Sequence, residues 1–130
     1  MPQIKVLMTG IAHNMITPGV FPEMDRALTE AVETAFNIKG RHDVAFDVLY
    51  LPYTRGESPV QIGVIYTAGT DEYRTGRIFD PTKEEREAAA IKVQESFAAF
   101  LIANGIGPIT PSVWIIPLYN SHFLSGQVEN

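Results

Sequence analysis

The stretch Pro2-Gln-Ile-Lys-Val-Leu-Met-Thr-Gly10 decides the fold that this sequence predicts. Apolar side chains recur through it with a period of two, and the run ends at a glycine, which is typical of a half-buried β-strand. The recurring apolar residues are Ile4, Val6 and Met8. Removal of Met1 would expose the ring nitrogen of Pro2 as a secondary amine. An amine held rigidly at the start of a buried strand can act as a general base, a general acid or a nucleophile.

Length and composition indicate one packed domain, or two small fused halves, that binds neither nucleic acid nor a membrane. Of the 130 residues, 45% are hydrophobic and 19% are charged. A net charge of −5 and a pI of about 5.1 disfavour nucleic-acid binding. No apolar run reaches the length of a membrane span, and no signal-peptide core is present, so we expect a cytoplasmic protein.

No metal or other cofactor is expected. The chain has no cysteine, which excludes disulfides, thiol catalysis and thiolate metal sites. The three histidines, His13, His42 and His122, lack the spacing of metal ligands.

A helix and a second strand are predicted to follow the first strand. The segment Ile11–Phe21 is rich in turn-forming residues and is expected to be a loop. A helix then begins at Pro22 and stops at Asn37 and Gly40. One stripe at helical spacing consists of Met24, Ala27, Leu28, Ala31, Val32, Ala35 and Phe36. Val44–Leu51 is the next predicted strand, and Pro52 ends it.

The pattern then starts again. Gln61–Thr67 matches Gln3–Thr9 at an offset of 58, with four of seven positions identical. Asp80-Pro81-Thr82 is a good helix start, with Asp80 as the expected N-cap, and the second helix should run to about Ala103. Its predicted buried residues match the first helix at an offset of 65, and they are Val93, Phe97, Phe100 and Leu101. Ser112–Pro117 also matches Asp47–Pro52 at an offset of 65.

The sequence therefore predicts an α+β fold of two tandem β-α-β units. They would form a four-stranded sheet with both helices on one face. We expect a single domain over residues 1–130, with residues 1–59 as the first unit and 60–130 as the second. The other face of the sheet would carry Leu7, Ile65 and Trp114, which favours an oligomer whose sheets face each other.

This organisation resembles the tautomerase superfamily, in particular its fused two-unit 4-oxalocrotonate tautomerase-like and cis-3-chloroacrylic acid dehalogenase-like members. Pro2 stands where that family has its catalytic amino-terminal proline. Arg74-Thr-Gly-Arg77 is similar to the Arg-x-Gly-Arg motif of the dehalogenase group. His122-Phe123, with Ser125-Gly126, resembles the carboxyl-terminal His-Phe-Gly-x-Gly-Gly segment, although Leu124 and Ser125 replace two of its glycines.

The resemblance implies a tautomerase or isomerase that acts on a small 2-oxo acid or dienol without a cofactor. Pro2 would be the general base, and Arg74 and Arg77 would hold the substrate carboxylate. Further substrate-binding candidates are Tyr73, Trp114, His122 and Phe123. An α-amino group titrates at about 7.7–8.0 in a peptide, and an apolar pocket beside two guanidinium groups would favour its neutral form. The family also implies a homotrimer.

Duplication predicts one working site in each chain. At the offset of 58, Pro2 corresponds to Val60, and an internal residue has no free amine. The stretch after Gly10 has no arginine, whereas the stretch after Gly69 has two. One half would supply the amine and the other half the cations.

Several alternatives remain at this stage. A hydratase, a decarboxylase or a cis-3-haloacrylate dehalogenase would use the same site. The dehalogenase and hydratase branch activates water with a histidine on the first helix, where this chain has Phe36, and with polar groups near the last strand, where it has Ile115 and Ile116. A non-catalytic trimer that binds a carboxylate and a ferredoxin-like dimer are further alternatives. The role of the segment Ile11–Phe21 is also left open, and covering the site, with His13 or Asn14 reaching it, is one alternative.

Overall fold

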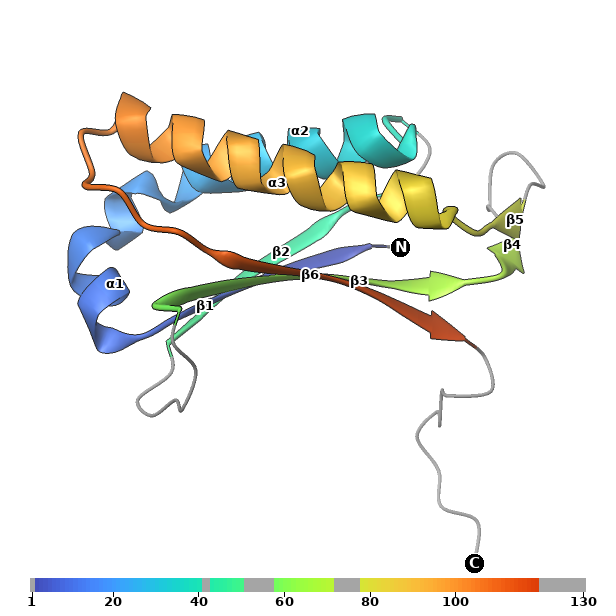
Figure 1. Ribbon diagram of the computed structural model, residues 1–130, viewed down its shortest axis with the longest axis horizontal. Helices are drawn as coiled ribbons and strands as arrows, with labels where there is room; N and C mark the ends of the chain where they lie inside the picture. The colour runs from blue at the N-terminus through green and yellow to red at the C-terminus, as the bar shows by residue number, and fades with distance from the viewer. Residues whose placement is uncertain (1, 41–42, 51–57, 72–77, 120–130) are drawn as a thin grey trace, which may run out of the picture.

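The computed structural model describes residues 2–40, 43–50, 58–71 and 78–119, and the statements below concern these residues. Figure 1 shows two long helices lying together on one face of a twisted sheet. The elements are β1 (Gln3–Met8), α1 (Gly10–Met15), η1 (Pro18–Val20), α2 (Phe21–Phe36), β2 (Ala45–Tyr50), β3 (Val60–Ala68), β4 (Thr70–Asp71), β5 (Ile78–Phe79), α3 (Lys83–Ala103) and β6 (Ser112–Tyr119). The predicted α+β fold is confirmed.

The main sheet has the strand order β2-β1-β3-β6. The pairs β1–β2 and β3–β6 are parallel, and the central pair β1–β3 is antiparallel. Each parallel pair is joined through one long helix, as expected for a β-α-β crossover. Because the central pair is antiparallel, an approximate twofold axis relates the two units. Under this axis β1 corresponds to β3, and β2 corresponds to β6.

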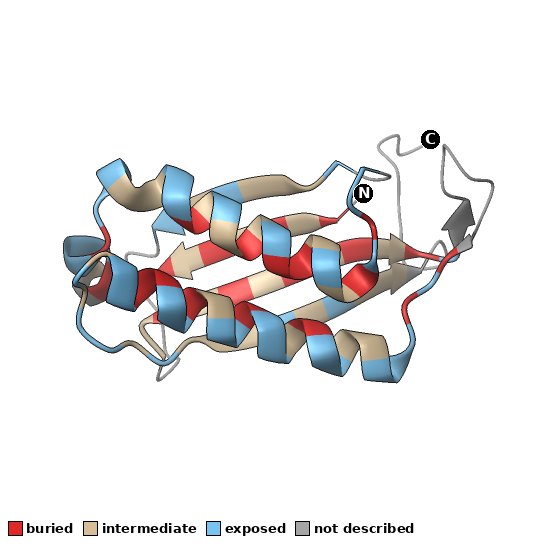
Figure 2. Cartoon of the chain, turned by 90° about the horizontal axis from the view of Figure 1, so that it is seen from above, coloured by how far each residue is buried: buried red, intermediate tan, exposed pale blue. Residues whose placement is uncertain are grey.

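The core lies between the sheet and the two helices (Figure 2). Side chains on β1 and β3 alternate between buried and half-buried along both strands, which is the pattern of a sheet with one covered face. Five of the seven residues in the predicted stripe of α2 are buried, and Ala27 and Ala35 are partly buried against the same core; the buried five are Met24, Leu28, Ala31, Val32 and Phe36. The predicted buried residues of α3 are confirmed as well, and they are Val93, Phe97, Phe100 and Leu101.

The other face of the sheet, hereafter the open face, carries no helix formed by the described residues (Figure 1). Its residues are Gln3, Lys5 and Leu7 on β1, Asp47 and Leu49 on β2, Gln61, Gly63, Ile65 and Thr67 on β3, and Ser112, Trp114, Ile116 and Leu118 on β6. Trp114 is 57% exposed, Leu49 is 44% exposed and Ile116 is 37% exposed. The expectation of an apolar second face at Leu7, Ile65 and Trp114 agrees with this arrangement.

The N-cap of α3 differs from the one expected. Thr82 is the N-cap rather than Asp80: its hydroxyl accepts from the Glu85 amide at 3.1 Å, and the Glu85 carboxylate accepts from the Thr82 amide at 3.0 Å. This is a capping box, and the Thr-x-x-Glu sequence is its signature. The first helix ends as expected at Asn37, which adopts the left-handed conformation with φ 53°.

The prediction that Ile11–Phe21 is a loop is wrong. The chain turns into α1 directly after β1, and the amide of His13 donates to the carbonyl of Thr9 at 2.8 Å. Ala12 and Ile16 are fully buried, and their burial anchors the short helix against the core. Turn-forming residues alone did not reveal these two anchors, because one apolar residue per turn is too weak a pattern.

The offset of 65 for the last strand is also wrong. Lys5 pairs with Asp47, and Gly63, the counterpart of Lys5, pairs with Trp114. Asp47 therefore corresponds to Trp114, at an offset of 67. The buried stripes of the helices do match at 65, but α3 continues to Ala103, two residues beyond the counterpart of Phe36, and this extension moves the following strand.

Candidate active site

Three chain segments that carry candidate residues converge at one end of the sheet. β1 begins at this end, directly after Pro2, and β3 and β6 both finish here (Figure 1). The β4–β5 pair stands at the same end, and the segment with Arg74 and Arg77 connects β4 to β5. The topology thus brings the proline, the stem of the arginine segment and the start of the carboxyl-terminal segment to one place.

Pro2 is buried and continues the strand geometry of β1. Its carbonyl oxygen accepts a hydrogen bond from the amide of Ala45 at 3.0 Å. Side chains alternate between the two faces along β1, and this alternation places the ring of Pro2 on the helix-covered face, in phase with Ile4. Extending the β1–β3 register by one residue places Pro2 opposite Tyr66. The backbone of Pro2 is therefore tied to the start of β2, and the register places it beside the end of β3.

An aromatic cluster (Phe36, Tyr66 and Phe79) lies on the same covered face at this end. The ring centroids of Tyr66 lie 5.4 Å from both Phe36 and Phe79, and Phe36 lies 5.8 Å from Phe79, all in edge-to-face arrangements. All three residues are buried. The cluster lies on the same face as Pro2, and Tyr66 stands opposite Pro2 in the extended register. Sequence reasoning missed Tyr66 and Phe79, although Tyr66 is in phase with the buried positions Ile62 and Val64 of its strand.

A tight turn carries the chain from β3 toward the arginine segment. Gly69 has a φ of 76°, a conformation that other residues adopt only with strain. Its amide donates to the carbonyl of Phe79 at 2.9 Å, which closes the base of the β4–β5 pair. The described residues do not include Tyr73, Arg74 and Arg77. In the sequence these three residues stand between β4 and β5, the two strands that this turn anchors at the Pro2 end.

The remaining sequence candidates divide into two groups. His122 and Phe123 lie outside the described residues, shortly after Tyr119, which pairs with Ala68 at the Pro2 end of the sheet. Trp114 is described, and it lies on the open face next to Gly63. Within one protomer Trp114 and the ring of Pro2 are on opposite faces of the sheet, so the structure does not bring them together.

The opposite end of the sheet holds the counterparts of these groups. The amide of Val60, in the position of Pro2, donates to the hydroxyl of Ser58 at 3.3 Å. The same hydroxyl donates toward the carbonyl oxygens of Val60 at 2.6 Å and Thr110 at 3.0 Å, so Ser58 ties the start of β3 to the segment before β6. At this end, a hydrogen-bonded backbone amide, that of Val60, occupies the position that Pro2 occupies at the other end.

The segment Ile11–Phe21 lies at this second end, as α1 and η1 show in Figure 1. The ring of His13 is 4.9 Å from the ring of Tyr50, at the end of β2. Within one protomer, therefore, this segment does not cover the Pro2 end, and the alternative in which His13 or Asn14 reaches the site fails for the same chain.

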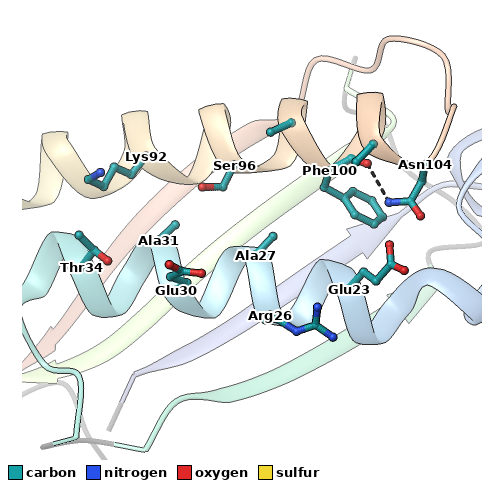
Figure 3. Close-up of a pocket in the computed structure, with 12 residues that line it drawn as sticks. Glu23, Arg26, Ala27, Glu30, Ala31, Thr34, Lys92, Ser96, Phe100 and Asn104 are labelled. Carbon is teal, nitrogen blue, oxygen red and sulfur yellow. Dashed lines mark hydrogen bonds between the residues drawn. The ribbon is translucent and has the colours of Figure 1, made fainter.

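A groove of about 480 Å³ runs between α2 and α3 on their outer side (Figure 3). Alanines such as Ala27 and Ala31 form its base, and charges of both signs, including Glu30 and Lys92, stand along its rim. The amide group of Asn104 in this groove donates to the carbonyl of Phe100 at 2.9 Å. The groove lies on the solvent side of the helices, away from Pro2, and we assign it no part of the chemistry.

No family model and no curated protein matches this amino-acid sequence. Solved structures do match the fold. A fused 4-OT in an asymmetric trimer aligns with a TM-score of 0.64 at 18% identity, covering 96% of this chain and 94% of that one. A fused 4-OT in a symmetric trimer aligns with a TM-score of 0.60 at 15% identity, covering 97% and 94%. Malonate semialdehyde decarboxylase aligns with a TM-score of 0.56 at 12% identity, covering 98% and 92%.

The chain has the tautomerase fold. The resemblance inferred from Pro2, the two arginines and the repeat is thus confirmed at the level of the fold. Within the described residues, no group of three or more histidine, cysteine, aspartate or glutamate side chains is placed to hold a metal ion. No helix in the described part of the chain is both long and apolar enough to span a bilayer.

Proposed function

We propose that this protein is a tautomerase whose amino-terminal proline moves a proton on a small 2-oxo acid or its dienol. Pro2 is the base, and Arg74 and Arg77 hold the substrate carboxylate. Phe123, with Tyr73 and His122, completes the pocket from the segments that start at the same end of the sheet. The observation that carries the proposal is the convergence of Pro2, the β4–β5 stem and the end of β6 in one tautomerase fold.

The surroundings of Pro2 suit proton transfer. A secondary amine acts as a base only in its neutral form, and apolar surroundings disfavour the protonated form. The aromatic cluster supplies such surroundings on the helix side. Two arginines stay charged at neutral pH and bind a carboxylate through paired hydrogen bonds. They also stabilise the negative charge that develops on an enolate oxygen.

The same cluster favours proton transfer over addition of water. Phe36 is buried between Tyr66 and Phe79, so its position on α2 presents a ring and no base. A hydratase needs a group that removes a proton from water. Dehalogenation and hydration are accordingly disfavoured, and decarboxylation of a 3-oxo acid is the closest variation that the same proline and arginines support.

We further propose that the working form is a cytoplasmic homotrimer. The open face exposes the large apolar side chains Leu49, Trp114 and Ile116 in each chain, and a soluble protein normally covers such a surface. Three copies with their sheets turned inward would cover it. The fused 4-OT structures with this fold are trimers.

Two measurements test the catalytic proposal. Intact mass of the purified protein should show the loss of Met1, since an acylated Pro2 nitrogen has no basic lone pair. The enol form of phenylpyruvate should then be converted to the keto form faster than in buffer alone, and its methyl ester should be a poorer substrate by at least tenfold. A protein that retains Met1 and converts both compounds at equal rates would contradict the assignment of Pro2 and of the arginines.

A further inference from the structure

The open face is not the same in its two halves, and the difference lies in the central row of the sheet. This row runs Asp47–Lys5–Gly63–Trp114 across the four strands. The approximate twofold axis passes between Lys5 and Gly63, so the first half of the row corresponds to the second. An ion pair in one half therefore takes the place of a glycine and a tryptophan in the other.

The first half of the row is an exposed ion pair. The ammonium group of Lys5 lies 3.1 Å from the carboxylate of Asp47, and their side chains are 33% and 53% exposed. The second half of the row combines a gap with a large ring. A side chain at Gly63 would meet no atom within 4 Å, and Trp114 beside it is the sole tryptophan of the chain.

The direction in which each subunit points matters when three such sheets close into a ring. The edge strands β2 and β6 lie at opposite sides of each sheet, so each chain meets one neighbour through its β2 half and the other neighbour through its β6 half. If all copies point the same way, every contact joins a β2 half to a β6 half. If one copy is reversed, one contact joins two β2 halves and another joins two β6 halves.

Burial energetics favour the first arrangement. Contact between two β2 halves would take two Lys5–Asp47 pairs out of water together, and the cost of removing charges from water is often larger than what their attraction returns. Contact between a β2 half and a β6 half places each ion pair against an indole and its apolar neighbours. An indole face attracts a lysine ammonium, which offsets part of that cost.

We propose that the open face is the interface of a symmetric trimer, in which the Lys5–Asp47 side of one copy docks against the Gly63–Trp114 side of the next. The proposal rests on the homotrimer put forward above and adds the direction of its subunits. Because the other counterparts on the open face are alike, such as Leu49 and Ile116, the central row is what distinguishes the ring of like-directed copies from the ring with a reversed copy.

Cysteine cross-linking tests the direction, since the native chain contains no cysteine that could react. Leu49 on β2 and Ile116 on β6 are counterparts on the edge strands, and both are exposed on the open face. We would compare L49C, I116C and the L49C/I116C double variant with a short flexible bis-maleimide, and analyse the products on a denaturing gel. Light scattering would first establish a mass of three times 14.4 kDa for each variant.

A symmetric trimer predicts cross-linked dimers and trimers from the double variant, at least tenfold above either single variant. Covalent dimers from L49C alone and from I116C alone would overturn the proposal, because they require like halves in contact. A lack of cross-links in all three variants would overturn it as well, since the open face would then not be the interface.

Two controls keep these outcomes interpretable. In K5M/D47L, which replaces the charges with apolar groups of similar volume, the preference for one direction should fall, and L49C placed in that background should cross-link to itself at least tenfold more than before. Emission of Trp114 should be blue-shifted in the trimer and red-shifted on dilution to monomer. Absence of tautomerase activity would leave every one of these readouts unchanged, so failure of the catalytic proposal is separable from failure of this one.

Discussion

At one end of the sheet β1 begins after Pro2, and at the other end β3 begins with its counterpart, Val60. Both residues are buried beside an antiparallel neighbour, so the two backbones are similar there. The nitrogen of Val60 is an amide held by Ser58, whereas the nitrogen of Pro2 becomes an amine once Met1 is removed. The comparison teaches that two similar backbones can differ in the chemistry available at their ends, because only the proposed base at Pro2 stands where a free amine could form.

The turns that follow the central strands differ in the same way. After β1 the chain passes through Gly10 into α1, with Ala12 and Ile16 buried. After β3 it passes through Gly69, in the left-handed conformation, into the β4–β5 pair that leads to both arginines. One end of the sheet is thus filled by a packed helix, and the other end carries a segment with two cations.

Exchange of the two strand-starting residues for alanine should give the largest contrast between the halves. Pro2→Ala replaces a rigid secondary amine with a flexible primary amine, and we expect kcat/KM to fall by roughly 10²–10⁴, the usual contribution of a general base. Val60→Ala should retain activity and lower the free energy of unfolding by about 2 kcal/mol, because it removes two buried methyl groups. Steady-state kinetics and urea unfolding measure the two effects. Equal kinetics for Pro2→Ala and the native protein would remove the proline from the mechanism.

Removal of the cations should have the next largest effect. Arg74→Ala or Arg77→Ala should lower kcat/KM for a 2-oxo acid by about 10–100-fold, as expected for loss of a hydrogen bond between charged groups. Arg26→Ala is the matched control, because Arg26 lies in the outer groove between the helices. The loss should be smaller for the methyl ester of the same acid. If Arg26→Ala gave the same loss as the other two, the carboxylate would bind elsewhere.

The two glycines after the central strands should respond differently to alanine. Gly69→Ala puts a side chain on a residue with φ 76° and should cost about 1–2 kcal/mol of stability. Activity should fall with it, since this turn carries the stem of the arginine segment. Gly10→Ala would place a methyl group about 3.4 Å from the hydroxyl of Tyr50, which is tight but tolerable, so its cost should be smaller. Thermal unfolding of both variants checks the order, and a larger loss at Gly10 would refute it.

The smallest contrast concerns two threonines at helix starts. Thr82 closes the capping box of α3, and Thr82→Ala should cost about 1 kcal/mol. Thr17 precedes η1 and makes no capping hydrogen bond through its side chain, so Thr17→Ala should cost less than about 0.5 kcal/mol. Urea unfolding monitored by circular dichroism resolves this difference. Identical midpoints for the two variants would show that the capping box contributes little.

Local patterns predicted the order and kind of the main elements. The alternation around Ile4 and Val64 gave two strands, and the spacing of Leu28 and Phe97 within their helices gave two buried stripes. These predictions succeeded because burial on one face repeats every two residues in a strand and about every 3.6 in a helix. The short helix that begins at Gly10 escaped the same reasoning, since the burial described at Ala12, and at Ile16 just beyond the helix, is too sparse to form a pattern.

The candidate site was predictable in part. Pro2, Arg74 and Arg77 stood out because their chemistry and their order along the chain resemble a known family. Tyr66 and Phe79 did not stand out, since aromatic residues in apolar runs are ordinary core residues. Their approach to Phe36 depends on packing between a strand and a helix that are distant in the sequence.

By itself the sequence determined that two similar units follow one another and that a proline stands directly after Met1, because composition, order and periodicity are properties of neighbouring residues. Only the tertiary structure decided that Pro2 and the stem of the arginine segment share one end of the sheet, that Ile11–Phe21 lies at the other, and that Trp114 faces away from the proline. The physical reason is strand register. Hydrogen bonding between distant strands sets which residues are opposite each other, and a shift of two residues, such as the one that separates the offsets of 65 and 67, leaves the local pattern unchanged.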